Sequence, residues 1–146
     1  VRPGVLIIHE WWGLNAHVKH WADRLAADGY AALAVDMYGG EVAKTSDDAM
    51  RLMRSVDEDA GAAVVANGLQ FLKTHAGIKA KRLAAMGWCF GGGWSLRAAL
   101  RFSDLDVDQL AKQYGPSMEL PAIGQRAKCT ECGHKGGAMQ VVAIRW

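Results

Sequence analysis

RLAAMGWCFGGGWSL, residues 82–96, decides the fold, because an apolar run leads through a cysteine among glycines into a second apolar segment. Arg82 to Met86 is predicted to be a buried strand and Trp94 to Arg101 a helix. Between them the pattern G-x-C-x-G is a cysteine version of the nucleophile elbow, a sharp strand-to-helix turn that raises a nucleophile above the edge of a sheet. Glycines on both sides permit a strained backbone and a close approach of helix to strand.

Cys89 has two interpretations. A free cysteine is most often a small buried residue that packs like an apolar side chain. At this position the following helix directs its positive end at the thiol, which favours the thiolate, and its first N–H groups can bind a developing oxyanion. The position therefore favours a nucleophile. A phosphate-binding loop is disfavoured, because no G-x-G-x-x-G occurs there and no Lys-Ser or Lys-Thr follows the glycines.

The residues before this turn alternate between strands and helices. Two more apolar runs are predicted to be buried strands, at Val5–His9 and Tyr30–Val35. Three amphipathic segments are predicted to be helices: His17 to Asp28, a helix capped by Thr45 or Ser46 that carries Met50 and Met53, and one with Val64, Val65, Leu69 and Leu72 on one face that ends at Gly77. This order implies parallel strands joined by right-handed crossovers. We therefore expect an α/β fold, a parallel sheet with helices on both faces.

Composition narrows the class of protein. The 146 residues suit one domain with a single core, and the hydrophobic fraction of 51% is that of a folded globular chain. A net charge of +2, with both signs mixed along the chain, predicts no nucleic-acid partner and no membrane surface. The run from Val5 to Ile8 is too short to span a bilayer. An odd number of cysteines argues against a disulfide framework, so we expect a cytoplasmic protein.

Ligands of open α/β sheets bind beyond the carboxyl ends of the strands. The first strand ends there in HEWW, residues 9–12, and the third ends at Cys89. The carboxylate of Glu10 would be partly desolvated beside the elbow, whereas a solvated loop glutamate is the alternative. The two tryptophans either line an apolar pocket or belong to the core. The histidine of HEWW is expected to pack or hydrogen-bond, and His17 and His20 to lie on a solvated helix face.

Three stretches, in this order, resemble the dienelactone hydrolase family, a cysteine branch of the α/β-hydrolase fold. They are PGVLIIHEWWGLN (Pro3 to Asn15), DGYAALAVDMYGG (Asp28 to Gly40) and MGWCFGGGWSL (Met86 to Leu96). The resemblance covers about residues 1–101, which we interpret as a partial α/β-hydrolase domain. It implies hydrolysis of a small-molecule lactone or carboxylic ester through a Cys-His-Asp triad, with no metal and no organic cofactor.

The resemblance also implies roles for single residues. Cys89 corresponds to the nucleophile, and Glu10 to the carboxylate that keeps the resting thiol protonated and swings away as substrate enters. The backbone amides of Phe90 and Trp11 match the two oxyanion-hole positions. The arginines that bind a substrate carboxylate in the family have no match, so the acyl or lactone group stays unspecified.

The family pattern fails after residue 101. In α/β-hydrolases the acid and the histidine follow the nucleophile on later strand ends, and each strand-helix unit takes about 30 residues. Too few residues follow Cys89 for this, and their only histidine is His134. Residues 102–146 are therefore expected to be a divergent tail. A sheet cut short after the elbow would expose an edge that favours a homo-oligomer.

The tail contains a C-x-x-C-G-H knuckle, Cys129 to His134, of the kind that presents thiolates to zinc. Three ligands are one short of a structural site, so no metal site is predicted within one chain. Inert surface thiols are favoured instead, and a redox pair or a site pooled from the cysteines of two chains are the alternatives. Asp108 to Tyr114 is predicted to be a short helix and Gln140 to Trp146 a strand.

Three functions remain open. The first is a lactone or ester hydrolase that uses Cys89 and has recruited His134 as its base, with turnover impaired because the Asp and His of the triad are unmatched. The second is a catalytically silent relic, or a binding module, that keeps the pocket of the fold. The third is a zinc-dependent interaction protein that acts through the tail. Hydrolase ancestry favours the first.

Overall fold

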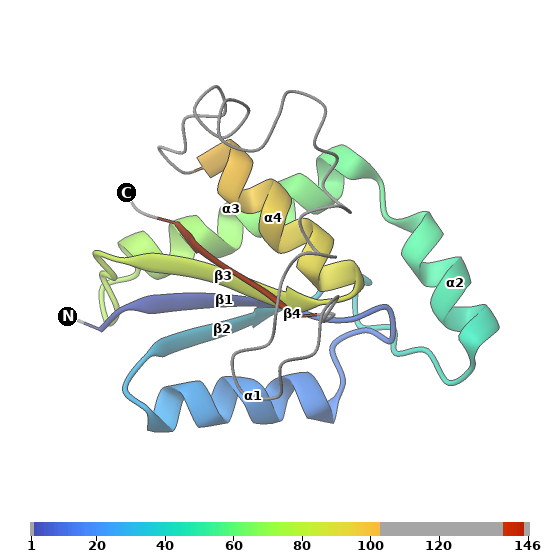
Figure 1. Cartoon of the computed structure of the whole chain (residues 1–146), viewed down its shortest axis with the longest axis horizontal. Helices are drawn as coiled ribbons and strands as arrows, with labels where there is room; N and C mark the ends of the chain where they lie inside the picture. The colour runs from blue at the N-terminus through green and yellow to red at the C-terminus, as the bar shows by residue number, and fades with distance from the viewer. Residues whose placement is uncertain (1, 103–138, 145–146) are drawn as a thin grey trace.

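The structure, a computed structural model, describes residues 2–102 and 139–144. Its elements follow the predicted order along the first hundred residues and add one strand near the end of the chain (Figure 1). In chain order they are β1 (Gly4–Ile8), α1 (Ala16–Ala27), β2 (Ala31–Val35), α2 (Ser46–Ser55), α3 (Glu58–Thr74), β3 (Leu83–Trp88), α4 (Phe90–Phe102) and β4 (Met139–Ile144). The predicted sequence of strands and helices is confirmed.

The boundaries differ most at the elbow. β3 runs on to Trp88, two residues beyond the predicted end, and α4 begins at Phe90 rather than at Trp94. The run Gly91–Gly93 therefore lies inside the first turn of the helix, not before it. Gly91 permits this early start, because the helix passes so close to the backbone of β1 at that residue that a side chain would not fit.

The sheet has the order β2-β1-β3-β4, with β1, β2 and β3 mutually parallel. β4 pairs antiparallel with β3, which confirms the strand predicted near the end of the chain. The elbow strand β3 is consequently an inner strand, so the expectation of an exposed edge directly after it was wrong. Within the described residues β2 and β4 form the two edges.

Helices cover both faces of the sheet, as predicted. α1 lies on one face, and α3 and α4 lie on the other (Figure 1). Successive side chains of β1 alternate between these layers: Val5 and Ile7 pack in a cluster with Val18 of α1, whereas Leu6 and Ile8 pack with Leu69 of α3 and its neighbours. All five residues of β1 are buried, which explains its unbroken apolar sequence.

Short polar side chains start the helices. Asn15 accepts a hydrogen bond from the Val18 N–H at the start of α1, and Thr45 accepts one from the Asp48 N–H at the start of α2. Asp57 caps α3 in the same way. Each cap satisfies an N–H group that has no partner inside its helix. No helix of the described part of the chain has the length and apolarity needed to cross a membrane.

Candidate active site

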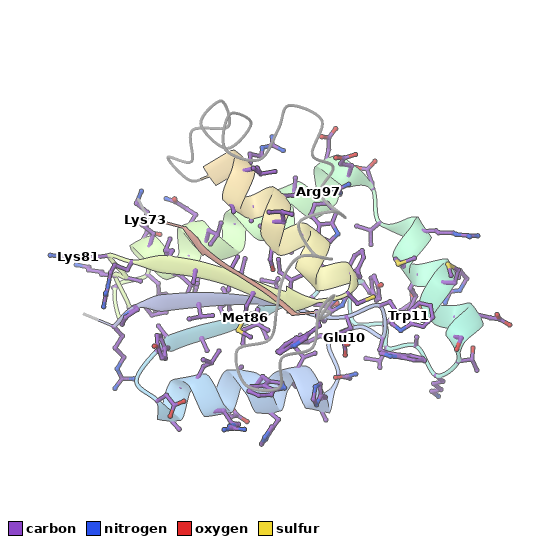
Figure 2. All side chains as sticks on the ribbon, in the orientation of Figure 1. Glu10, Trp11, Lys73, Lys81, Met86 and Arg97 are labelled. Atoms are coloured by element: carbon purple, nitrogen blue, oxygen red, sulfur yellow. The ribbon has the colours of Figure 1, made fainter. Side chains whose placement is uncertain are left out.

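Three strand ends meet at one edge of the sheet. The register pairs Ile8 of β1 with Val35 of β2 and with Gly87 of β3, so the residues that follow these three strands emerge together. Glu10 and Trp11 lie at this edge (Figure 2). Because β1 is the middle strand of the three, its exit segment lies between the other two, and the predicted site residues are brought to one place.

Cys89 forms the turn between β3 and α4. Its φ of 52° lies in the left-handed region, which non-glycine residues occupy at a cost of about 1–3 kcal/mol. Its carbonyl accepts a hydrogen bond from the Gly93 N–H at 3.2 Å, so Cys89 stands at the cap position of α4, and the residue is exposed. The predicted strand-to-helix turn is thus present, with the cysteine at the positive end of a helix.

Gly87 and Gly91 make this turn sterically feasible. A Cβ built on Gly87 would lie 2.5 Å from the Gly91 carbonyl oxygen and 2.7 Å from that of Ile8. A Cβ on Gly91 would overlap the Ile8 carbonyl oxygen and lie 2.5 Å from that of His9. At both positions a side chain would clash with backbone atoms, which cannot move aside as a flexible side chain could. Both positions therefore require glycine.

His9, the residue that follows β1, is completely buried. Its Nε2 accepts the Met37 N–H at 3.0 Å, so the proton of the neutral ring is on Nδ1, which donates to the Glu10 carbonyl at 2.5 Å. Burial lowers the pKa of His9, and the Glu10 hydrogen bond and the Asp36 carboxylate only partly oppose this. Both ring nitrogens are occupied, which confirms the expectation that this histidine packs and hydrogen-bonds.

Tyr38, which follows β2, reaches the same place. Its hydroxyl donates to the Trp11 carbonyl at 3.2 Å, and its ring lies 4.6 Å from that of His9 and 5.6 Å from that of Phe90. Burial first, and then the charge of Cys89, raise the pKa of Tyr38 to about 12. The phenol therefore stays protonated and is close enough to the thiol for the two to interact electrostatically.

Tyr38 was missed in the sequence, although the end of the second strand could have pointed to it. Asp36 holds the loop, because one carboxylate oxygen accepts the Tyr38 N–H at 2.8 Å and the other accepts the Gly40 N–H at 2.5 Å. An aspartate that caps a turn directly after a parallel strand places the next side chains at the ligand-binding edge. The sequence DMYGG, Asp36 to Gly40, has this pattern of an aspartate and a glycine turn directly after a strand.

Glu10 lies at the predicted edge and is half-buried. Within residues 2–102 no hydrogen bond or ion pair to its carboxylate is found. The indole rings of Trp11 and Trp12 contact each other edge to face at 5.2 Å, and both residues are half-buried. The exit of β1 thus presents a carboxylate and partly exposed aromatic surface beside the elbow.

The remaining histidines of the described residues make no hydrogen bond to the Cys89 thiol. His17 accepts the Trp21 indole N–H at 3.3 Å, and His17 and His20 are both exposed on α1, as predicted. His75 ends α3. His134 and the C-x-x-C knuckle at Cys129 and Cys132 lie outside the described residues. In the part of the chain that the structure describes, no group of three or more His, Cys, Asp and Glu side chains could hold a metal ion.

A model of the dienelactone hydrolase family matches residues 1–143, and so extends beyond residue 101, where the resemblance by motif ended. Protein usf of Aquifex pyrophilus is 38% identical over 119 residues, which cover 77% of this chain and 51% of that protein. The carboxymethylenebutenolidase of Pseudomonas putida is 25% identical over 126 residues, 80% of this chain and 52% of that protein.

Among solved structures, a dienelactone hydrolase-like promiscuous phosphotriesterase from metagenomic libraries is 34% identical, with a TM-score of 0.60. The match covers 67% of this chain and 42% of that one. The chain spans about half the length of the curated relatives it matches. The shared fold, the elbow between β3 and α4, and a family match over most of its length together show that this chain belongs to the dienelactone hydrolase family.

Proposed function

We propose that the protein cleaves a small lactone or carboxylic ester through a thioester on Cys89. The observation that carries the proposal is the exposed cysteine with φ of 52° at the start of α4, at the edge where three parallel strands end. A nucleophile needs this exposure, and the helix start favours its thiolate. Family membership supports the same substrate class.

In the proposed acylation step the Cys89 thiolate attacks the carbonyl carbon, and the π electron pair moves to the carbonyl oxygen. The resulting oxyanion then collapses, the carbon–oxygen double bond re-forms, and the bond to the leaving alkoxide breaks. The alkoxide takes a proton from solvent water, and in a lactone it stays tethered to the acyl group. Water then attacks the thioester and gives one proton back to solvent, the carbon–sulfur bond breaks, and the acid and the thiolate are released.

The amides of Phe90 and Trp11 are the proposed oxyanion hole. Phe90 is the first residue of α4, and the first N–H groups of a helix have no partner inside it. The Trp11 N–H has no hydrogen-bond partner within the described residues either. Unpaired N–H groups at this edge can bind the oxyanion as it forms, because no existing hydrogen bond has to be broken first.

Glu10 is proposed to hold the resting thiol protonated. Glu10 and Cys89 each follow the register pair Ile8–Gly87 by two residues, on neighbouring parallel strands. This placement supports the proximity that the role requires. Displacement of the carboxylate by substrate would then release the thiolate for attack.

Hydrolysis of the thioester needs a base to activate water. His9 is occupied at both nitrogens, and the other described histidines make no hydrogen bond to Cys89. Recruitment of His134, outside the described residues, as the base is the alternative, and it would give steady turnover instead of a burst. Because no histidine of residues 2–102 is hydrogen-bonded to the Cys89 thiol, we expect acylation to outpace hydrolysis.

The test is stopped-flow release of p-nitrophenolate from p-nitrophenyl acetate. We expect a burst of one product per chain followed by slow turnover, and loss of the burst in Cys89→Ala. The double variant Cys129→Ser/Cys132→Ser is the matched control and should keep the burst. A burst that survives in Cys89→Ala contradicts the proposal, and absence of any burst in the unaltered protein favours the silent relic. Fast steady turnover that His134→Ala abolishes would establish His134 as base.

A further inference from the structure

The peptide between Glu10 and Trp11 supplies one proposed oxyanion donor, the Trp11 N–H. In a trans peptide the carbonyl and the N–H of the same unit point in opposite directions. Whatever fixes the direction of the Glu10 carbonyl therefore also fixes the direction of the Trp11 N–H. Two groups bond to that carbonyl: Nδ1 of His9 at 2.5 Å and the Gly13 N–H at 3.2 Å.

The ring that makes the shorter of these bonds is itself held in place. Nε2 of His9 accepts the Met37 N–H, which ties the ring to the end of β2. The ring stacks on Phe90, at 5.8 Å between ring centroids, and packs edge to face with Tyr38, at 4.6 Å. With 0% of its surface exposed, no water competes for either nitrogen. The ring can neither rotate nor exchange its partners easily.

We propose that His9 is a positioning residue, which aims the Trp11 N–H at the oxyanion by donating its Nδ1 proton to the carbonyl of the same peptide. The inference rests on the proposed function, because the oxyanion belongs to that reaction. Tyr38 completes the arrangement from the other side: its hydroxyl bonds to the Trp11 carbonyl, so both peptides that flank Trp11 are held.

A histidine that only fills the core would fit the same burial. The two roles differ in which nitrogen matters. Positioning requires the donor at Nδ1, whereas a merely structural ring would be replaced equally well, or equally badly, by any side chain of similar size. The amide nitrogen of asparagine can take the place of Nδ1, and the amide of glutamine can reach the place of Nε2, so His9→Asn and His9→Gln separate the two nitrogens.

The first measurement needs no variant. Long-range proton–nitrogen correlation of the imidazole rings in the unaltered protein should show His9 protonated at Nδ1 and unprotonated at Nε2. The opposite tautomer would overturn the proposal outright, because Nδ1 could then not donate. This result is independent of any enzymatic activity, and therefore of the proposed function.

The second measurement is amide hydrogen exchange at Gly13 and Met37, whose N–H groups report on the two ends of the His9 network. His9→Asn should keep Gly13 protected and expose Met37, and His9→Gln should do the reverse. His75→Asn, at the end of α3, removes one imidazole elsewhere and should change neither. Equal loss at both amides in the two variants would favour a structural role and contradict positioning.

The third measurement compares two reactions of Cys89. Acylation by p-nitrophenyl acetate creates an oxyanion, whereas alkylation by iodoacetamide, followed on the Cys89 peptide by mass spectrometry, creates none. We expect His9→Gln to slow the burst by up to the roughly 100-fold that loss of one oxyanion donor costs, and His9→Asn to slow it much less. Alkylation should change little in either variant.

The two proposals fail in distinguishable ways. If the unaltered protein gives no burst, the proposed function fails, and the tautomer and the exchange pattern still decide whether His9 holds the peptide. If the burst is normal and both variants slow acylation and alkylation alike, His9 acts on the thiol or on the fold as a whole, and the positioning role is wrong.

Discussion

Two segments supply the proposed oxyanion amides, and they are shaped by different forces. The elbow, Gly87–Gly91, is shaped by exclusion: at Gly87 and at Gly91 backbone approaches backbone so closely that no Cβ fits. The exit of β1, His9–Gly13, is shaped by hydrogen bonds from buried side chains. The steric constraint at the elbow depends on glycines that can be recognised in the local sequence. The hydrogen bonds at the exit of β1 form only when the sheet has brought three strand ends together.

The comparison predicts that the elbow tolerates no side chain at its tightest point. Gly91→Ala should destabilise the protein by about 4 kcal/mol or more, because the added methyl group would overlap the Ile8 carbonyl of β1. Gly93→Ala is the matched control, since a Cβ there meets nothing within 4 Å and alanine is favoured in a helix by about 1 kcal/mol. Urea unfolding measures both. A Gly91→Ala variant that folds with nearly unchanged stability would contradict the steric account.

The exit of β1 should instead be sensitive to pH. Histidine ordinarily titrates with a pKa of 6.5, and burial lowers the pKa of His9 in the folded state. As the pH falls below about 6.5, the unfolded state takes up this proton first. The contribution of His9 to stability is therefore complete above that pH and falls toward the lower, folded pKa, with a slope of at most about 1.4 kcal/mol per pH unit.

Urea unfolding between pH 8 and pH 5 checks this, with His9→Gln as the comparison, because glutamine can accept the Met37 N–H but does not titrate. The unaltered protein should lose more stability over the range than the variant does. The Asp36 carboxylate, 3.8 Å from Nε2, attracts the protonated ring and offsets part of the loss. Parallel curves for the two proteins would show that His9 does not titrate differently on folding.

The same contrast explains what could be predicted from the sequence. The apolar runs and glycines predicted β1, β2, β3 and the helices between them, because burial on both faces and helical spacing are local patterns. The elbow followed from five residues. The start of α4 was placed four residues late, since glycines suggest a loop when their neighbours in space are unknown.

The network behind the β1 exit could not be predicted in this way. The Met37 N–H that holds His9 comes from a residue 28 positions away, and Tyr38 reaches Trp11 across 27. The hydrogen-bond partner of a histidine or a tyrosine cannot be predicted from that residue and its sequence neighbours alone. Only the register of β1 with its two neighbours brings these groups together, so the role of the network appears with the structure.

The smallest expected effect concerns the strain at the elbow itself. Cys89 and Lys79 are the non-glycine residues of the described chain with positive φ, at 52° and 45°. Replacing a side chain in this region by glycine should stabilise the fold by roughly 1 kcal/mol relative to alanine. We expect Cys89→Gly to unfold at higher urea than Cys89→Ala, with acylation absent from both. Lys79→Gly should gain similar stability relative to Lys79→Ala and keep the burst. If the gain appears at Lys79 but not at Cys89, the turn between the two glycines is relaxed, and the exposed thiol is held there without conformational strain.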